Sequence, residues 1–438
     1  MKSSVSVLLT LIFAFMLVPS VLAEPKGVSM NAGQGVRYEY LDTYDLKKLK
    51  GMVTTGVRDF LSGSDYSALS IIDKLKNVPR NPVKLYKVTY DSILPGPGNQ
   101  PVIGTGLVAI PDIKGSRFPM ISYQHGTVFA RSEVPSQVNK SELIDETKLM
   151  LAVFASQGYV VIAADYFGLG DSTLPNTYFV PGATEQACLD MLFASRAVLK
   201  AENKETTHMF LHGWSQGGYN TLRFLKRLET MGETVTAAST AAGPTDLKIW
   251  INRLMNNPQP SDAVWVASAA SNLFLAMDTY LQPGLAEEAI RPEFLAIARQ
   301  FYNFEISFID FFQQTPQLLR DYLNPEFMES GKLGTSAFWQ LIDTHENYRW
   351  AMSTPVRSYY GQVDEAVPAV IVQLPARIAP LLGTSTQALS AGVNSDHRGT
   401  YLYSLTKLPA WHTHLMKAER WGDDVSVPRQ RSDSPAKK

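Results

Sequence analysis

The pattern of apolar and polar positions changes character twice along the chain. Residues 83–90 alternate between the two kinds of side chain, and 103–110 form a second apolar stretch after the Pro-Gly-Pro-Gly turn signal at 95–98. These segments predict an antiparallel hairpin at the start of a sheet. Between residues 118 and 242, short apolar segments then alternate with helical ones. Such alternation is typical of a parallel sheet with helices on both faces.

The alternation places individual elements and exposes one long interruption. Strands are predicted at 118–123, 159–164, 209–212 and 235–242, and helices at 141–157, 184–201 and 217–230. Residues 248–350 are helical in pattern and rich in aromatic side chains. Because this segment is too long for a connection inside a compact domain, we expect it to form a subdomain of its own. Residues 355–360 and 386–390 resume the sheet as its last strands.

The remaining segments complete a division of the chain. Residues 24–80 are mixed polar and helical in pattern, which predicts an N-terminal arm packed on the main domain. The main domain comprises 81–247 and 351–424, and 248–350 is inserted between these two parts. Residues 425–438 consist largely of Ser, Pro and charged residues, and we expect them to be disordered.

The first 23 residues are typical of an export signal. Lys2 supplies a positive start, residues 5–18 are almost entirely apolar, Pro19 ends the run, and 21–23 fit a small-residue cleavage site before Glu24. An uncleaved membrane anchor is the alternative, but the run is short compared with the roughly 20 apolar residues that a spanning helix needs. We therefore expect a secreted or periplasmic protein whose mature chain begins near Glu24.

Composition excludes several function classes. Lys and Arg total 40 and Asp and Glu total 41, so the balance of charge does not favour nucleic acid as a partner. Cys188 is the only cysteine, which rules out an internal disulfide. It lies in the amphipathic helical pattern of 185–194, which indicates a buried small side chain rather than a catalytic thiol. The sequence contains no repeat, CxxC pair or HExxH motif, we expect no metal or cofactor, and the oligomeric state stays open.

The strongest chemical signal is Gly-Trp-Ser-Gln-Gly at 213–217, followed by Gly218. It stands between a predicted strand and a predicted helix, which is the context that a nucleophile elbow requires. A sharp turn there would project the Ser215 hydroxyl above the sheet. Free N–H groups at the start of the next helix would favour developing negative charge. Without this context, the same pattern also occurs in ordinary glycine–serine turns.

A serine hydroxyl needs a base within hydrogen-bond reach, and the base needs a carboxylate to hold its tautomer. His397 follows the last predicted strand and precedes a short helix predicted to begin near residue 398, so its loop would return over the site. His412 and His414 are the alternative bases. Asp364 ends an apolar strand, at the sheet edge where open α/β sheets bind ligands, and Glu365 is the alternative carboxylate.

Together these motifs resemble the α/β-hydrolase superfamily, and more narrowly its secreted lipases and esterases with a large helical lid. The resemblance covers roughly residues 83–405, and the order Ser, Asp, His is that of the family. The matching segments are the oxyanion loop at 124–127, a D-x-x-G-x-G-x-S turn at 165–172 with Phe at 167 in place of the usual Arg, the acid loop at 361–368 and the histidine loop at 395–397. We interpret the 165–172 turn as scaffold, because its glycines permit a tight turn.

The resemblance implies an α/β-hydrolase fold, a mostly parallel sheet flanked by helices, with 248–350 as its lid. It also implies a triad of Ser215, His397 and Asp364. One oxyanion donor would be the N–H of Gln216. For the second donor we favour Thr127. This chain has His-Gly-Thr where many relatives have His-Gly-Gly, which leaves Gly126 as the alternative.

The expected reaction is hydrolysis of a small-molecule or lipid ester by acyl transfer to water. The aromatic side chains of 248–350 suit an apolar acyl chain or a transient contact with a lipid interface, although they would equally serve as the lid's own core. Esterase is therefore a safer prediction than lipase. A peptidase or acyltransferase using the same triad, and a non-catalytic binding module, are the alternatives. The physiological substrate and its acyl-chain length stay open.

Overall fold

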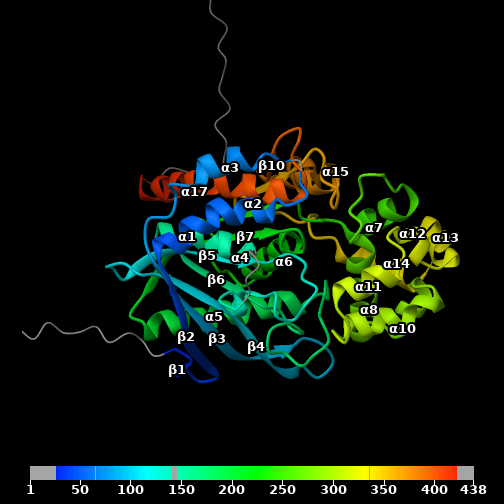
Figure 1. Cartoon of the computed structure of the whole chain (residues 1–438), viewed down its shortest axis with the longest axis horizontal. Helices are drawn as coiled ribbons and strands as arrows, with labels where there is room; N and C mark the ends of the chain where they lie inside the picture. Colours follow the sequence, from blue (N-terminus) through cyan, green and yellow to red (C-terminus); the bar gives the residue numbers. More distant parts are fainter. Residues whose placement is uncertain (1–25, 65, 141–145, 335, 422–438) are drawn as a thin grey trace, which may run out of the picture.

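The computed structural model describes residues 26–64, 66–140, 146–334 and 336–421 (Figure 1). The export signal expected at 1–23 and the tail expected at 425–438 lie outside these residues. No helix in the described part of the chain combines the length and hydropathy that a bilayer span requires.

The described residues form one ten-stranded sheet in the order β1-β2-β3-β4-β6-β5-β7-β8-β9-β10. Strands β1 to β4 and the β4–β6 pair are antiparallel, and the remaining pairs are parallel. The predicted opening hairpin is therefore confirmed as β3–β4. The strands span Ser29–Gly33, Val36–Tyr44, Val83–Leu94, Gln100–Pro111, Arg117–Gln124, Val160–Ala164, Glu205–Trp214, Ala237–Ala241, Val356–Tyr360 and Gln387–Ser390, from β1 to β10 in chain order.

Helices cover both faces of the sheet, as the alternating pattern predicted. Helices α5 (Ala183–Ala201) and α6 (Gln216–Thr230) pack on one face, and α4 (Glu146–Val153) and α17 (His397–Trp421) pack on the other (Figure 1). The second face also carries the N-terminal helices. These are α1 (Leu46–Gly51), the π-helical turn η1 (Met52–Gly56), α2 (Val57–Phe60) and α3 (Ala68–Leu75). The short helices α15 (Ala369–Val372) and α16 (Leu374–Ile378) follow β9.

Two local expectations are wrong. The segment 24–80 is not only helical, because β1 and β2 extend the sheet at its antiparallel edge. Because of a register shift between Tyr40 and Asp42, the next buried side chain of β2 after Tyr38 is Leu41, three residues later. This spacing breaks the two-residue alternation that marks a strand. The helix that begins at His397 is also not short, since α17 continues through an internal proline for 25 residues.

The described part of residues 248–350 contains the α-helices α7 to α14 and the short 3-10 helix η4 (Asp343–His345), which gather beside the sheet on one side of the molecule (Figure 1). We call this segment the helical insertion. Its helices span Leu247–Asn256, Val266–Tyr280, Leu285–Ala289, Pro292–Tyr302, Phe308–Gln314, Leu319–Tyr322, Pro325–Leu333 and Ala337–Ile342.

The insertion shares a hydrophobic core with the sheet domain. Phe274 and Trp339 of the insertion lie in the same buried cluster as Phe179 and Tyr219 of the sheet domain. Two tyrosine hydroxyls of the insertion also donate to backbone carbonyls of the sheet domain, from Tyr280 to Pro175 at 2.6 Å and from Tyr302 to Asn176 at 2.6 Å. Many of the aromatic side chains therefore serve the core, as the plainer interpretation of their abundance proposed.

Cys188 is buried in α5 as a free thiol, and burial raises its pKa well above the ordinary value. This location confirms the interpretation as a small core side chain. His412 is buried as well, with its ring stacked on Phe210 at 3.9 Å between centroids. Neither ring nitrogen of His412 has a hydrogen-bond partner among the described residues, and burial holds its pKa well below 6.5.

His412 is expected to make the fold sensitive to acid. Its imidazole takes up a proton near pH 6.5 when the chain unfolds but stays neutral in the core. The free energy of unfolding therefore falls below pH 6.5, by at most about 1.4 kcal/mol per pH unit for this residue. His412→Phe should remove this contribution, and urea titrations at pH 6.5 and 4.5 would measure it. His414→Phe, on the exposed face of the same helix, is the control, and an equal decline in both variants would contradict the assignment.

Candidate active site

Ser215 occupies a sharp turn between β7 and α6. Its backbone adopts φ 57° and ψ −123°, a conformation that side chains other than glycine rarely take. The N–H of Ser215 donates to the carbonyl of Ala241 at 2.9 Å, which ties the turn to β8. Gln216 is the first residue of α6, where a backbone N–H has no partner within the helix.

Glycines around the turn permit contacts that no side chain would allow. A Cβ atom on Gly213 would lie 2.1 Å from the carbonyl oxygen of Gly217, and one on Gly217 would lie 1.9 Å from that of Gln124. Similarly, a Cβ on Gly218 would lie 2.8 Å from the Cα of Gly243. The start of α6 is therefore pressed against the ends of β5 and β8.

Asp364 and His397 come together at the same edge of the sheet. The loop after β9 carries Asp364, whose Oδ1 accepts the N–H groups of Ala366 at 2.9 Å and Val367 at 2.8 Å. The Nδ1 of His397, the first residue of α17, lies 3.0 Å from Oδ1 and 3.1 Å from Oδ2 of Asp364. These contacts orient both the carboxylate and the ring.

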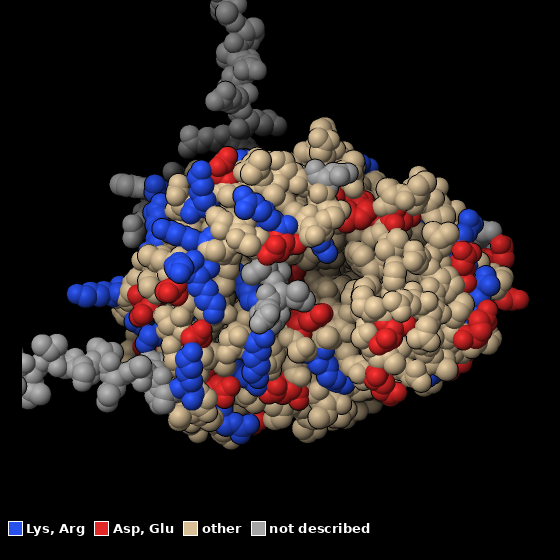
Figure 2. All heavy atoms as spheres, in the orientation of Figure 1, with Lys and Arg blue, Asp and Glu red and all other residues tan. Residues whose placement is uncertain are grey.

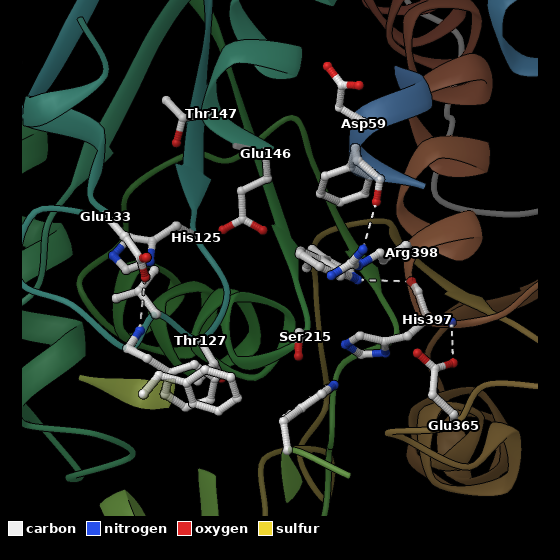
Figure 3. A pocket seen from close by; sticks show the side chains of 16 residues that line it. Asp59, His125, Thr127, Glu133, Glu146, Thr147, Ser215, Glu365, His397 and Arg398 are labelled. Atoms are coloured by element: carbon white, nitrogen blue, oxygen red, sulfur yellow. Dashed lines mark hydrogen bonds between the residues drawn. The ribbon is translucent and has the colours of Figure 1, made fainter. Parts of the chain in front are cut away.

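The other side of the His397 ring faces Ser215 (Figure 3). Its Nε2 is buried and has no hydrogen-bond partner within the described residues. Burial works to lower the pKa of His397, but the charge and hydrogen bond of Asp364, assisted by Glu365 and Asp396, raise the pKa above 6.5. The geometry thus presents a basic nitrogen to the serine.

The alternative candidates lie elsewhere or make other contacts. His412 is in the core, and His414 is exposed on the same helix. Glu365 accepts the backbone N–H of His397 at 3.0 Å rather than the ring, and its pKa is raised chiefly by burial. Among the carboxylates near the histidine, Asp364 has the geometry of a ring partner.

The loop after β5 carries the two candidates for the second oxyanion donor. The N–H of Gly126 donates to the carboxylate of Glu146. No hydrogen bond of the Thr127 N–H is found in the described part of the chain, while its hydroxyl lies 2.7 Å from the hydroxyl of Tyr178. The engagement of Gly126 therefore favours Thr127 as the donor.

His125 makes contacts that hold this loop in place. Its ring stacks on Tyr166 at 4.1 Å, and its two nitrogens lie 2.8 Å from the carbonyl oxygen of Gly126 and 3.2 Å from that of Asp165. Burial lowers the pKa of His125 to about 4, so the ring is neutral at pH 7 and donates to one carbonyl only.

The turn at 165–172 is also built as a scaffold. The buried Asp165 accepts the hydroxyl of Thr105 at 2.6 Å and the N–H of Ser136 at 2.9 Å. The guanidinium of Arg131 donates to three carbonyls in and just after the turn, those of Gly168, Ser172 and Leu174. Its geometry agrees with the structural interpretation of this motif.

Ser215 and His397 line a cavity of about 460 Å³, within the size range of small-molecule sites. It lies at a hollow beside the helical insertion (Figure 2). Aromatic side chains form much of its wall, and the ring of Phe129 stacks on that of Phe308 at 4.7 Å. The remaining aromatic wall residues are Phe60, Trp214 and Trp265.

Several wall residues carry no signal in the sequence. Glu146 and Arg398 reach the cavity beside Ser215 and His397, as does Asp59 from the N-terminal arm (Figure 3). None lies in a motif that assigns it a role at the site, since only the tertiary fold brings α2 and α4 to the serine. Among the described residues, no group of three or more His, Cys, Asp or Glu side chains is arranged to hold a metal ion.

Comparison with known proteins finds one family model that matches part of the chain. Residues 132–224, which include Ser215, match the family model of secretory lipases. No curated protein matches the chain in sequence.

Solved structures share the fold at low sequence identity. A candidate hydrolase from Legionella pneumophila aligns with a TM-score of 0.74 and 21% identity, over 89% of this chain and 99% of its own. The rice cell wall degrading esterase LipA from Xanthomonas oryzae aligns with a TM-score of 0.67 and 18% identity, over 90% and 98%. Candida antarctica lipase A in its closed state aligns with a TM-score of 0.60 and 16% identity, over 80% and 79%.

These likenesses confirm the predicted α/β-hydrolase fold. The family match over residues 132–224 supports the predicted resemblance to secreted lipases and esterases.

Gly217→Ala is expected to destabilise the protein, because the new Cβ would meet the carbonyl oxygen of Gln124 at 1.9 Å. Forced shifts of this kind typically cost about 1–3 kcal/mol. Gly51→Ala is the matched control, since it lies in a helix and a Cβ there meets nothing within 4 Å. Urea unfolding should show a loss for Gly217→Ala alone, and a loss of equal size at Gly51 would refute the steric explanation.

Proposed function

We propose that the protein is a serine esterase that hydrolyses carboxylic esters through an acyl-enzyme on Ser215. The observation that carries the proposal is the 3.0 Å contact between Asp364 and the Nδ1 of His397, whose Nε2 is unpartnered and faces Ser215 across the cavity. The three side chains have the roles of nucleophile, base and orienting carboxylate that acyl transfer requires.

The reaction proceeds in two halves. The Ser215 oxygen attacks the ester carbonyl while its proton passes to Nε2 of His397. Asp364 accepts the N–H at Nδ1 and stabilises the imidazolium. The tetrahedral intermediate collapses, and the departing alkoxide takes the proton from Nε2 as it leaves as an alcohol. Water then attacks the acyl-enzyme while His397 again accepts a proton. The second tetrahedral intermediate collapses, the Ser215 oxygen takes that proton from Nε2 as its bond to the acyl group breaks, and the carboxylic acid is released.

Two backbone donors stabilise the negative oxygen of each tetrahedral intermediate. The Gln216 N–H stands at the start of α6, where the helix dipole favours negative charge. The Thr127 N–H is the second donor, because Glu146 already accepts the N–H of Gly126. Loss of one such donor typically costs about 10²–10³ in kcat.

The substrate class follows from the wall of the cavity. The stacked rings of Phe129 and Phe308 offer apolar surface beside the serine, which suits an apolar acyl chain. Secretion is part of the proposal, and it rests on the predicted export signal and the match to secretory lipases.

Ser215→Ala and His397→Ala are each expected to abolish most hydrolysis of p-nitrophenyl esters. Because the triad acts as a unit, the double variant should be little worse than either single one.

In the unmodified protein, kcat/KM should fall as the pH drops through the raised pKa of His397, since a protonated ring cannot accept the serine proton.

A fluorophosphonate probe gives an independent test of Ser215 as the nucleophile. It should label the unmodified protein at Ser215 and leave Ser215→Ala unlabelled, with circular dichroism showing that both are folded. Near-normal turnover by folded Ser215→Ala would overturn the assignment. Turnover of an aminoacyl amide or transfer to an alcohol in preference to ester hydrolysis would indicate a peptidase or an acyltransferase instead.

Phe308→Ala is expected to change the preference for acyl length. Because Phe308 supplies apolar wall from the helical insertion, its loss should lower kcat/KM for long-chain p-nitrophenyl esters about tenfold relative to the acetate. A point variant is preferable to deletion of the insertion, because the insertion shares a buried core with the sheet domain and its removal would expose that core.

Ile309→Ala is the matched control for the acyl-length prediction. Ile309 is the next residue of α11 and is 56% exposed, so its loss should leave the ratio unchanged. A Phe308→Ala variant that kept the original preference across chain lengths would argue that the insertion does not contact the acyl group.

A further inference from the structure

The N-terminal arm packs close to the histidine loop at 395–397. Helix α1, the π-helical turn η1 and α2 follow one another without a break from residue 46 to 60, and α1 and η1 pack against α4 (Figure 1). The side chains of Leu49, Val53 and Val57 are fully buried along this run and hold it on the face of the sheet that α17 also covers. A π-helical turn within a helix is often found at a functional site.

The end of α2 forms part of the cavity wall. The ring of Phe60 lies 5.4 Å from that of Trp214, the residue before the nucleophile, and 5.7 Å from that of Tyr401. Asp59 and Phe60 line the same cavity as Ser215 (Figure 3). The arm is therefore part of the site rather than a distant extension of the sheet.

Arg398, the residue after His397, connects this part of the chain to the N-terminal arm. Its Nη1 donates to the carbonyl oxygens of Phe60 at 3.0 Å and Ser62 at 3.1 Å. Hydrogen bonds from a charged donor are stronger than neutral ones, and a cation at the carbonyl end of a helix is favourable. The backbone beside the catalytic ring is thus fastened to α2.

The neighbours of Arg398 make further contacts with the arm. The carboxylate of Asp396 accepts the hydroxyl of Ser64 and the N–H of Gly399. A Cβ on Gly399 would lie 2.5 Å from the ring of Tyr66, so only glycine permits the arm to approach this closely. Residues 396, 398 and 399 all contact the arm, whereas the side chain of His397 turns into the cavity.

We propose that Arg398 is a positioning residue, which ties the histidine loop to the N-terminal arm and so fixes the ring of His397 relative to Ser215. This inference rests on the proposed function, since it concerns the same serine and histidine. It assigns the arm a role in turnover, because small displacements of a catalytic group lower the rate of the chemical step more than they weaken binding.

The test compares Arg398→Met, Arg398→Lys and the control Arg58→Met, which removes an exposed arginine from the same arm. Rates are measured on p-nitrophenyl butyrate per active site titrated with the fluorophosphonate probe, well below the unfolding temperature. Arg398→Met should lower kcat about 10–100-fold with KM within about threefold of the original. Arg398→Lys retains one charged donor and should recover part of kcat, and Arg58→Met should be unchanged.

Three outcomes would overturn the inference. They are an unchanged kcat in Arg398→Met, a raised KM with unchanged kcat, which would make Arg398 a substrate-binding residue, and equal losses in the Lys and Met variants. If Arg398→Met does not fold, Ser64→Ala tests the same attachment from the arm and should also lower kcat. An unmodified protein that neither reacts with the probe nor hydrolyses esters would overturn the proposed function itself, which distinguishes the two failures.

Discussion

The contact between Gly217 and the carbonyl of Gln124 sets the geometry on which the rest of the site depends. It presses the start of α6 against the end of β5, so the Ser215 turn and the loop after β5 occupy fixed positions relative to each other. The strained φ of Ser215 is held by its surroundings, since the Ser215 N–H donates to the carbonyl of Ala241 at the end of β8. Asp364 and His397 then only have to reach a point that is already defined.

Most of the central fold could be predicted from the sequence because its local and tertiary signals agree. The parallel strands are short apolar runs between amphipathic helices, and the structure has each where the pattern placed it. The failures have physical causes. The register shift at Tyr40 and Asp42 hid the period of β2, and α17 passes through Pro409, a residue that normally ends a helix.

The candidate site was predictable only where a residue type is tied to a local motif. Ser215 stands in an elbow, Asp364 in the loop after β9, and His397 where the chain after β10 enters α17, so the sequence could nominate them and the structure brings them together. Glu146 and Arg398 could not be found this way. Each acts on a neighbour through contacts made by segments far apart in the chain, from Glu146 to Gly126 and from Arg398 to Phe60, and no local pattern encodes such pairs.

The solitary thiol of Cys188 has a practical consequence for following motion in this protein. With one cysteine in the sequence and that one sealed inside α5, folding needs no oxidant, and thiol reagents find no ready target on the native surface. A cysteine introduced at Leu318, which is 49% exposed on the helical insertion, would therefore accept a single fluorophore or spin label. Such a reporter would reveal whether the insertion and the sheet domain move as one body while substrate enters and product departs.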